Sequence, residues 1–352
     1  MYPQIVIDIN KYKQNIKYLV DRCTNRGVKV WIVTKSFCAY PDIVSHLVDC
    51  GIDGLADSRI QNLKKMKDIR AKKILLRIPM IDEAEDVVLW SDYSLNSEID
   101  TIRVLGEKAK KLGKRHRIII MLDMGDLREG VWPDDIDDFI KEVLKVDGIE
   151  IKGFGTNLTC YGGVIPDENN LGRLTSIALD MANKYSLDIE YISGGNSSSY
   201  YLLEDGRLPN GINNLRLGEV AILGRETAFG KKIDSLSDDT FILKAEIVEI
   251  KKKPSVPIGN IGMDAFGNKP HYEDRGIIKR AIVAIGRQDI NPEGLIPLDK
   301  NIDILGASSD HTILDVTRSN INYKVGDVVE FKMDYGSLLK AMTSEYVNKV
   351  VI

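Results

Sequence analysis

Eight short apolar runs, separated by segments with helical periodicity, constrain the fold of this chain more than any other feature. Each run stops at a polar or glycine-rich turn, and the segments between the runs repeat their apolar residues every three or four positions. Strands that alternate with helices form parallel βαβ units. The runs are residues 28–33, 54–56, 73–78, 93–95, 117–122, 150–154, 189–192 and 214–217.

Eight βα units in sequence predict a (β/α)₈ barrel of the TIM type. The run 54–56 is the weakest strand, and the last predicted helix is short. The predicted helices are residues 11–26, 42–49, 58–67, 82–89, 98–112, 134–146, 168–185 and 197–203.

The pattern changes after about residue 230, where strand-like stretches recur without long helices between them. We therefore predict an α/β chain with a barrel in residues 1–230 and a mostly β C-terminal domain in residues 231–352. The N-terminal strand 4–9 is a candidate to pair with that second domain. The predicted strands of the second domain are 241–250, 280–284, 301–305, 311–316 and 327–332.

Composition excludes several classes of protein. The chain has 352 residues and a formal net charge of −4, which gives no sign of a nucleic-acid-binding surface. No apolar stretch approaches the length of a membrane span, and no signal peptide is recognised at the start. The four cysteines and four histidines are scattered without metal-ligand spacing. We expect a cytoplasmic protein with reduced thiols, no metal, no membrane contact and no nucleic-acid partner.

Lys35 directly follows the first barrel run, at the strand end where barrel enzymes place their chemistry. A lysine at the end of a buried strand is costly to desolvate unless it has a partner or a function. Such a lysine can lose its proton near neutral pH and attack a carbonyl carbon to form a Schiff base. The alternative is an ordinary lysine whose ammonium reaches solvent.

Other strand ends carry polar residues suited to a phosphorylated, heteroaromatic ligand. Gly194-Gly195-Asn196-Ser197 resembles an anion cradle at a helix start, although a plain turn with an N-cap has the same pattern. Arg216 ends the eighth run, and a guanidinium facing a ring nitrogen would keep that nitrogen unprotonated. Arg128 and Asn157 follow the fifth and sixth runs. Salt bridges at the barrel rim and a loop asparagine are the plainer alternatives. A Schiff-base lysine, a phosphate cradle and two arginines together favour pyridoxal 5′-phosphate as cofactor.

The residues resemble those of the alanine-racemase-like, fold-type III pyridoxal-phosphate enzymes over nearly the whole chain. The motifs that carry the resemblance are Val33–Ala39, Gly153–Cys160, Ser193–Ser198, Leu215–Glu219, Pro257–Gly267 and Gly286–Asp289. The resemblance implies a barrel followed by a β domain, with the second domain of one subunit completing the site of its partner in a head-to-tail homodimer.

The resemblance also implies a role for individual residues. Lys35 would hold the cofactor covalently and act as a base on one face, and Arg216 would contact the pyridine nitrogen. Arg128 would lie near the ring hydroxyl, and Asn157 takes the place of a ring-stacking histidine. The phosphate would be held by Asn196, Ser197, Gly218, Glu219 and Tyr346.

Two departures from the family pattern concern tyrosines. Ala39 stands where the family has a tyrosine four residues after the lysine, and Tyr40 comes one residue later. Asn260 stands where alanine racemases supply a tyrosine as the second base, and an amide cannot act as a general base. Our candidates for the second catalytic base are Asp264 and His311, with Tyr335 behind them, although each has a plain structural alternative.

We expect the reaction to be racemisation of ornithine or a similar basic amino acid. The side-chain ammonium of such a substrate favours a carboxylate partner, and Asp264, Gln288 and Asp289 are the expected substrate-binding residues. A racemase of alanine or of broad specificity remains an alternative. A pyridoxal-phosphate decarboxylase or aldolase, and a non-racemising protein that only carries the cofactor, are two further alternatives.

Overall fold

The computed structural model describes every residue except 268 and 270. It divides into two compact units. The barrel unit comprises Ile9–Asp238, and the second unit comprises Met1–Asp8 and Asp239–Ile352.

The boundary between the units lies after Asp238 rather than after residue 230. The backbone N–H of Ile233 donates to the carbonyl of Gly224 (2.9 Å), and that of Ser237 donates to Asn15 Oδ1 (2.9 Å). These contacts tie the intervening segment to the barrel unit, and the sequence offered no periodicity there from which to predict them.

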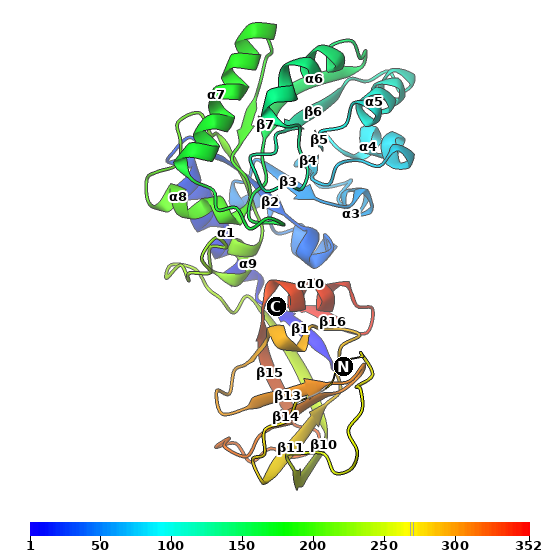
Figure 1. The fold of residues 1–352 in the computed structure, drawn as a ribbon, viewed down its shortest axis with the longest axis vertical. Helices are drawn as coiled ribbons and strands as arrows, with labels where there is room; N and C mark the ends of the chain where they lie inside the picture. Colours follow the sequence, from blue (N-terminus) through cyan, green and yellow to red (C-terminus); the bar gives the residue numbers. More distant parts are fainter. Residues whose placement is uncertain (268, 270) are drawn as a thin grey trace. The chain divides into compact units, whose positions relative to one another are not determined.

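Eight parallel strands close into a barrel, which confirms the predicted (β/α)₈ architecture (Figure 1). Closure is made by β9 pairing with β2, where Arg216 lies opposite Trp31. The strands are β2 (Lys29–Val33), β3 (Gly54–Asp57), β4 (Lys72–Leu75), β5 (Tyr93–Asn96), β6 (His116–Met121), β7 (Ile149–Gly155), β8 (Tyr191–Ser193) and β9 (Asn214–Leu217).

Helices cover the outside of this barrel (Figure 1). They are α1 (Ile9–Thr24), α2 (Pro41–Val44), α3 (Ile60–Lys65), α4 (Ala84–Trp90), α5 (Ile99–Lys111), α6 (Ile136–Val143), α7 (Glu168–Tyr185), α8 (Tyr200–Glu204) and α9 (Glu219–Leu223). Four predicted helices include a 3₁₀ turn. Residues 82–89 and 134–146 begin with the turns Ile81–Glu83 and Pro133–Asp135. Residues 42–49 give α2 and a separate 3₁₀ turn, and 197–203 begins as a 3₁₀ turn before α8. Hydrogen bonds there run three residues back, as from His46 N–H to the Ile43 carbonyl (3.1 Å).

The barrel interior is filled by alternate side chains of the strands, as the period of a β-strand requires. Gly153 on β7 lets β8 approach closely, because a Cβ at this position would stand 2.1 Å from the Tyr191 carbonyl oxygen. The interior cluster consists of Trp31, Val33, Ala56, Ile74, Tyr93, Leu95, Ile119, Met121 and Tyr191.

Asp53 closes the floor of the barrel, one residue before β3. Its carboxylate accepts hydrogen bonds from Trp31 Nε1 (2.9 Å), Tyr191 OH (2.8 Å) and Lys72 Nζ (3.2 Å). Burial acts to raise the pKa of Asp53, but these hydrogen bonds and the charge of Lys72 outweigh it and leave the pKa lowered. The carboxylate of Asp53 therefore joins Trp31, Lys72 and Tyr191 at the floor of the barrel.

The second unit is built on an antiparallel sheet (Figure 1). The N-terminal strand β1 pairs antiparallel with β10 and parallel with β16. The elements are β1 (Gln4–Ile7), β10 (Phe241–Pro254), β11 (Ile277–Val283), β12 (Leu295–Pro297), β13 (Asp303–Ala307), β14 (Thr312–Asp315), β15 (Val328–Met333), α10 (Tyr335–Thr343) and β16 (Asn348–Val351).

Three elements of the second unit were not predicted: β12, α10 and β16. The two strands have three and four residues, too few to show a period. Helix α10 did carry a signal, because Asp334 caps it by accepting from the Ser337 N–H (2.7 Å).

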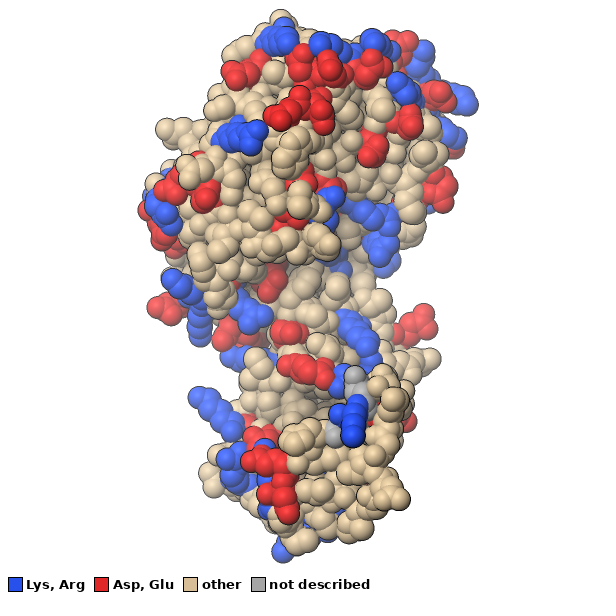
Figure 2. All heavy atoms as spheres, in the orientation of Figure 1, with Lys and Arg blue, Asp and Glu red and all other residues tan. Residues whose placement is uncertain are grey.

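On the face drawn in Figure 2, acidic and basic side chains are interspersed on both units. This mixture agrees with the small net charge. Within the described residues, no helix is long and apolar enough to cross a membrane.

His116 at the start of β6 is buried, and its Nε2 lies 2.8 Å from Ser94 Oγ. Burial, with a smaller contribution from the charge of Lys114, lowers its pKa from 6.5 to about 4. The unfolded chain therefore binds a proton below pH 6.5 that the folded protein excludes.

We predict that His116 makes folding stability fall as the pH drops from 6.5 towards 4. The full effect is about 3 kcal/mol of unfolding free energy. Urea unfolding at pH 7 and pH 4.5 checks this, with His116→Gln expected to lose less stability than the parent between the two values. The exposed His46, replaced by Gln, is the control and should behave as the parent does. Equal pH slopes for His116→Gln and the parent would contradict the prediction.

Candidate active site

The carboxyl ends of neighbouring barrel strands bring together the residues that the sequence singled out in the first domain. In the closed barrel β7, β8, β9 and β2 are consecutive neighbours. Asn157, Asn196, Arg216 and Lys35 follow or end these four strands in that order. The barrel therefore gathers them on one arc of its rim.

Arg216 is the buried cation of this arc, with 3% of its surface exposed. Its Nη1 donates to Ser193 Oγ (2.5 Å), and its Nη2 donates to the Thr156 carbonyl (2.6 Å) and to Asn157 Oδ1 (3.4 Å). Burial lowers the pKa of Arg216 to about 10, and the charge of Glu129 opposes that effect. The guanidinium thus stays charged at neutral pH and is fixed by three acceptors at the carboxyl ends of β7 and β8.

Asn157 is oriented by donors and an acceptor on opposite sides of its amide. Its Oδ1 accepts from Asn196 Nδ2 (2.9 Å) as well as from Arg216, and its Nδ2 donates to Glu129 Oε1 (3.4 Å). Asn196 Nδ2 also donates to the Leu158 carbonyl (2.9 Å). The amides of Asn157 and Asn196 therefore have defined orientations beside the guanidinium.

Ser197 and Ser198 form a cradle of hydroxyls and N–H groups after β8. Asn196 Oδ1 accepts from the Ser198 N–H (2.8 Å) and so caps the 3₁₀ turn Ser197–Ser199. Ser197 Oγ accepts from the N–H groups of Gly218 and Val220 (3.3 Å each), which leaves its hydroxyl proton to donate elsewhere. The hydroxyl of Ser198 is buried and has no protein partner among the described residues. A buried hydroxyl of this kind can form a hydrogen bond with a ligand atom.

Lys35 begins the 3₁₀ turn Lys35–Phe37 directly after β2 and is half-buried. It follows Val33, which packs in the barrel interior, by two residues. Position and burial agree with the expectation that this lysine stands at the rim of the barrel.

Arg128 and Glu129 pair with each other on the loop after β6. The hydrogen bond to Glu129 is the largest cause of a raised pKa for Arg128. In the same loop Asp126 accepts from the N–H groups of Thr159 (3.1 Å) and Tyr161 (2.9 Å), so its buried carboxylate shapes the neighbouring β7 loop. Burial acts to raise the pKa of Asp126, but the backbone N–H groups outweigh it and leave the pKa lowered.

Sequence reasoning did not assign roles to Asp57, Asp126, Glu129 or Ser198. Each of them follows or ends a barrel strand, so the rule that pointed to Lys35 covered them as well. What the sequence did not show was their distant partners, such as Thr34 for Asp57, Thr159 for Asp126 and Asn157 for Glu129.

In the second unit, the segment of Arg287 contacts the two segments that carry Asp264 and His311. The backbone N–H groups of Arg287 and Gln288 donate to the carbonyls of Ser308 and Ser309 (2.8 Å each), in the hairpin turn that leads to His311. The guanidinium of Arg287 also lies over the ring of Phe266 (5.3 Å), two residues after Asp264. The turn is tight, because a Cβ on Gly286 would stand 2.4 Å from the Asp310 nitrogen.

These second-unit residues differ in exposure and partners. Asp289 is buried, and its Oδ1 accepts from Ser344 Oγ (2.6 Å). Ser344 Oγ in turn accepts from the N–H of Tyr346 (3.0 Å), whose side chain is 66% exposed. His311 Nδ1 lies 3.2 Å from Asp310 Oδ1, and Asp264 is exposed on the loop between β10 and β11. Asp264 and His311 are therefore exposed, whereas Asp289 is buried.

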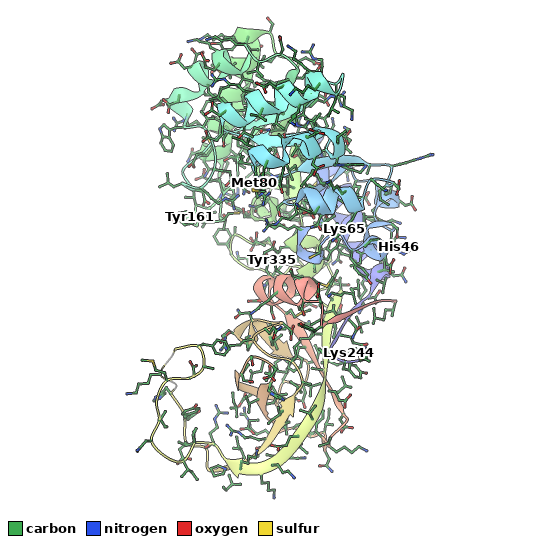
Figure 3. All side chains as sticks on the ribbon, turned by 90° about the vertical axis from the view of Figure 1, so that its right-hand side faces the viewer. His46, Lys65, Met80, Tyr161, Lys244 and Tyr335 are labelled. Carbon is green, nitrogen blue, oxygen red and sulfur yellow. The ribbon has the colours of Figure 1, made fainter. Side chains whose placement is uncertain are left out.

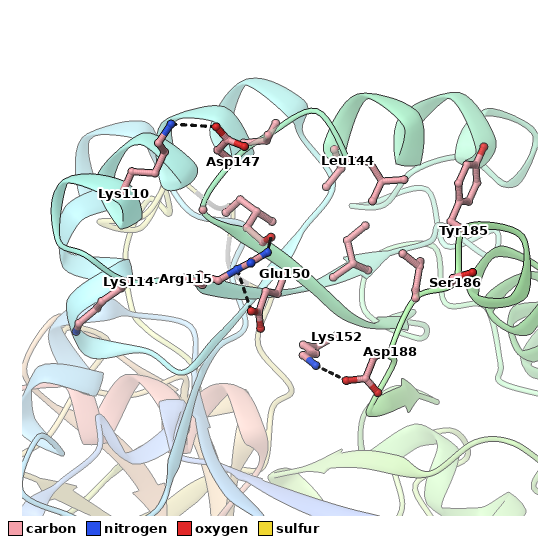
Figure 4. A pocket seen from close by; sticks show the side chains of 16 residues that line it. Lys110, Lys114, Arg115, Leu144, Asp147, Glu150, Lys152, Tyr185, Ser186 and Asp188 are labelled. Atoms are coloured by element: carbon pink, nitrogen blue, oxygen red, sulfur yellow. Dashed lines mark hydrogen bonds and ion pairs between the residues drawn. The ribbon is translucent and has the colours of Figure 1, made fainter.

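A hollow of about 610 Å³ lies at the other end of the barrel strands (Figure 4). It is lined by chain that leads into β6 and β7, away from the rim that carries Lys35 and Arg216. Its basic side chains pair with acidic ones, as in Lys110–Asp147 (3.0 Å), Arg115–Glu150 (2.9 Å) and Lys152–Asp188 (2.7 Å). We do not assign the active site to this hollow, because its charges already satisfy one another.

Comparison with known proteins identifies the family of the chain. The family model described as alanine racemase, N-terminal domain, matches residues 7–225. The chain is 55% identical over 353 residues to an ornithine racemase of Acetoanaerobium sticklandii, with 100% of both chains covered. It is 43% identical over 352 residues to a lysine racemase of Thermotoga maritima, covering 99% of this chain and 98% of that one.

Solved structures share the fold. An alanine racemase of Bartonella henselae with covalently bound pyridoxal phosphate has a TM-score of 0.74 and covers 99% of both chains. Its sequence identity is 17%, so this likeness concerns the fold alone.

Proposed function

The chain belongs to the alanine racemase family, as its motifs predicted, and we propose that it is an amino-acid racemase that uses pyridoxal 5′-phosphate to interconvert L- and D-ornithine. The observation that carries the proposal is full-length similarity to an ornithine racemase in a chain whose barrel rim holds Lys35, Arg216 and the Ser197–Ser199 turn together. The similarity to a lysine racemase supports a basic substrate and makes lysine the second candidate.

The rim residues fit the proposed cofactor. The Ser198 hydroxyl, buried and without a protein partner, and the hydroxyl proton of Ser197 suit a phosphate group. Gly218 and Glu219 lie at the start of α9, beside Ser197. Asn196 supports this cradle as the cap of its turn, and we also assign to phosphate binding the exposed Tyr346.

Pyridoxal phosphate, when bound, supplies an electron-withdrawing ring that makes the proton on the substrate Cα easier to remove. Lys35 is proposed to anchor it and to hold or return that proton on one face. Arg216 is proposed to donate to the ring nitrogen and, because a guanidinium does not give up its proton, to keep that nitrogen unprotonated. This limits how strongly the ring withdraws electrons and favours return of the proton to Cα. Asn157 and Arg128 are proposed to lie beside the ring and its hydroxyl.

A racemase needs a second acid–base group on the opposite face of the substrate. We propose His311 or Asp264 for this role, because both are exposed on the second unit beside the Arg287 segment. Asp264 is also the proposed partner of the substrate's side-chain ammonium, together with Gln288. Asp289 is less suited to that contact, since its buried carboxylate already accepts from Ser344.

We further propose a homodimer in which the second unit of one subunit completes the site of the other. Apolar side chains on the loop after β10 support this, since Ile258 is 91% and Met263 is 80% exposed. On the barrel rim Leu127 is 67% and Tyr161 is 76% exposed, and Figure 3 labels Tyr161. Exposed apolar groups gathered in this way are typical of protein interfaces. The cytoplasmic location and the absence of nucleic-acid partners remain predictions from the sequence.

The function is tested by chiral chromatography after the protein, loaded with pyridoxal phosphate, has been incubated with L-ornithine, L-lysine or L-alanine. We expect ornithine to approach an equal mixture of enantiomers and alanine to stay largely unchanged. Lys35→Ala should slow racemisation by on the order of 10³-fold, because it removes an acid–base group and the anchor. Lys29→Ala, at the other end of β2, is the control and should remain active. Racemised alanine with unchanged ornithine would contradict the assignment.

The shared site is tested by mixing two impaired variants, Lys35→Ala and Asp264→Ala. If the two residues serve one site from different subunits, exchange of subunits creates sites without either substitution, and the mixture regains ornithine racemase activity. A mixture of Lys35→Ala with a barrel-rim variant such as Arg216→Ala should not regain activity, and Asp274→Ala on the same loop as Asp264 should be active by itself. No regain with Asp264→Ala after verified exchange would argue against the shared site.

A further inference from the structure

A buried carboxylate stands next to the segment that carries Lys35. Asp57 is the last residue of β3 and has no exposed surface. Strand β3 pairs with β2, and the Thr34 N–H donates to the Ala56 carbonyl (2.8 Å). A carboxylate without exposure is costly to bury unless its oxygens are satisfied.

Both oxygens of Asp57 are satisfied by groups of the barrel rim. Oδ2 accepts from the hydroxyl of Thr34 (2.6 Å). Oδ1 accepts from the Arg59 N–H (2.9 Å) and from Asn62 Nδ2 (3.1 Å). Because Thr34 immediately precedes Lys35, its short hydrogen bond fixes one end of the lysine's turn.

The other end of that turn is connected to the same carboxylate through α3. Asn62 Oδ1 accepts from Lys65 Nζ (3.0 Å), and Lys65 Nζ also donates to the Cys38 carbonyl (2.9 Å). Lys65 belongs to α3 and is labelled in Figure 3. The path from Thr34 through Asp57, Asn62 and Lys65 to Cys38 therefore encloses residues 34–38.

The enclosed turn is strained. Cys38 and Ala39 have φ values of 54° and 47°, in the left-handed region that residues with a Cβ rarely adopt. Two such residues in succession persist only where their surroundings hold them, and strain of this kind gathers at functional sites. The turn after Lys35 thus depends on contacts such as that from Lys65.

Asp57 also lies within the field of Lys35. Burial raises the pKa of Asp57, while hydrogen bonds from Thr34, Asn62 and the Arg59 N–H, together with the charge of Lys35, act against that rise. The carboxylate is therefore placed to influence the lysine both through the turn and through space.

We propose that Asp57 is the positioning residue of Lys35: through Thr34 on one side and through Asn62 and Lys65 on the other, it holds the strained turn that presents the lysine amine at the barrel rim. The inference rests on the proposed function in one respect, namely that Lys35 is the residue to which pyridoxal phosphate attaches.

The test compares two hydrogen-bonded aspartates at opposite ends of β3, of which Asp57 is buried and Asp53 is half-buried. Asp57→Asn keeps the size of the side chain but removes its charge and one acceptor. Asp53→Asn makes the same change at the barrel floor, where the carboxylate has three donors of its own. Each folded variant, stripped of cofactor, is mixed with pyridoxal phosphate, and samples are reduced with borohydride at set times. The mass gain of the Lys35 peptide then gives the rate of attachment without any measurement of racemisation.

We expect Asp57→Asn to slow attachment to Lys35 by at least about tenfold, the factor that corresponds to losing one hydrogen bond to a charged group. Asp53→Asn should stay within about twofold of the parent even where its urea midpoint falls, because its contacts lie at the barrel floor. Equal attachment rates for Asp57→Asn and Asp53→Asn would overturn the proposal.

Thr34 supplies a second pair of variants if Asp57→Asn fails to fold. Thr34→Val is close in shape and removes the hydroxyl, whereas Thr34→Ser keeps it. Slow attachment in Thr34→Val, restored in Thr34→Ser, supports the positioning role, and equal rates in the two contradict it. Failure of the parent itself to attach pyridoxal phosphate at Lys35 would instead overturn the proposed function, so the two failures are distinguishable.

Discussion

The proposed site depends on a guanidinium buried at the carboxyl end of the barrel. Removing a cation from water is unfavourable unless hydrogen bonds replace its hydration. Arg216 meets this requirement with Ser193 Oγ, the Thr156 carbonyl and Asn157 Oδ1, which belong to the ends of β7 and β8 and the loop after β7. The same contacts orient Asn157, which orients Asn196, which caps the turn of Ser197. The buried guanidinium of Arg216 therefore organises the amides of Asn157 and Asn196 and, through them, the hydroxyl cradle.

Lys35 is supported separately, on the side of the barrel where β9 meets β2 and β2 meets β3. Asp57 ties both ends of its turn, so the lysine is positioned by a buried anion as the rest of the arc is positioned by a buried cation. A reacting amine held in a fixed place loses little freedom when it reacts, which is a large part of how enzymes lower barriers.

The sequence predicted the barrel because eight runs with alternating helices leave few other topologies. It also predicted Lys35, Arg216, Asn196 and Ser197 as members of one rim, since strand ends in a barrel converge. It did not reveal Asp57 or Glu129, whose importance lies in partners distant in the chain, such as Thr34 and Asn157. The broken helix at 42–49 and the short strands β12 and β16 were missed because three to five residues show no reliable period. The second base stays a prediction for a related reason: the proposed shared site depends on contacts between two copies of the chain.

We propose above that this chain removes and returns the proton on the Cα of ornithine. The most direct measurement is proton NMR of L-ornithine incubated with the cofactor-loaded protein in D₂O. With acid–base groups on opposite faces, every D-ornithine molecule formed should carry deuterium at Cα, the Cα proton signal should disappear, and the carbon skeleton should stay intact. Loss of the carboxyl group, cleavage of the skeleton or a persistent Cα proton signal would contradict the account.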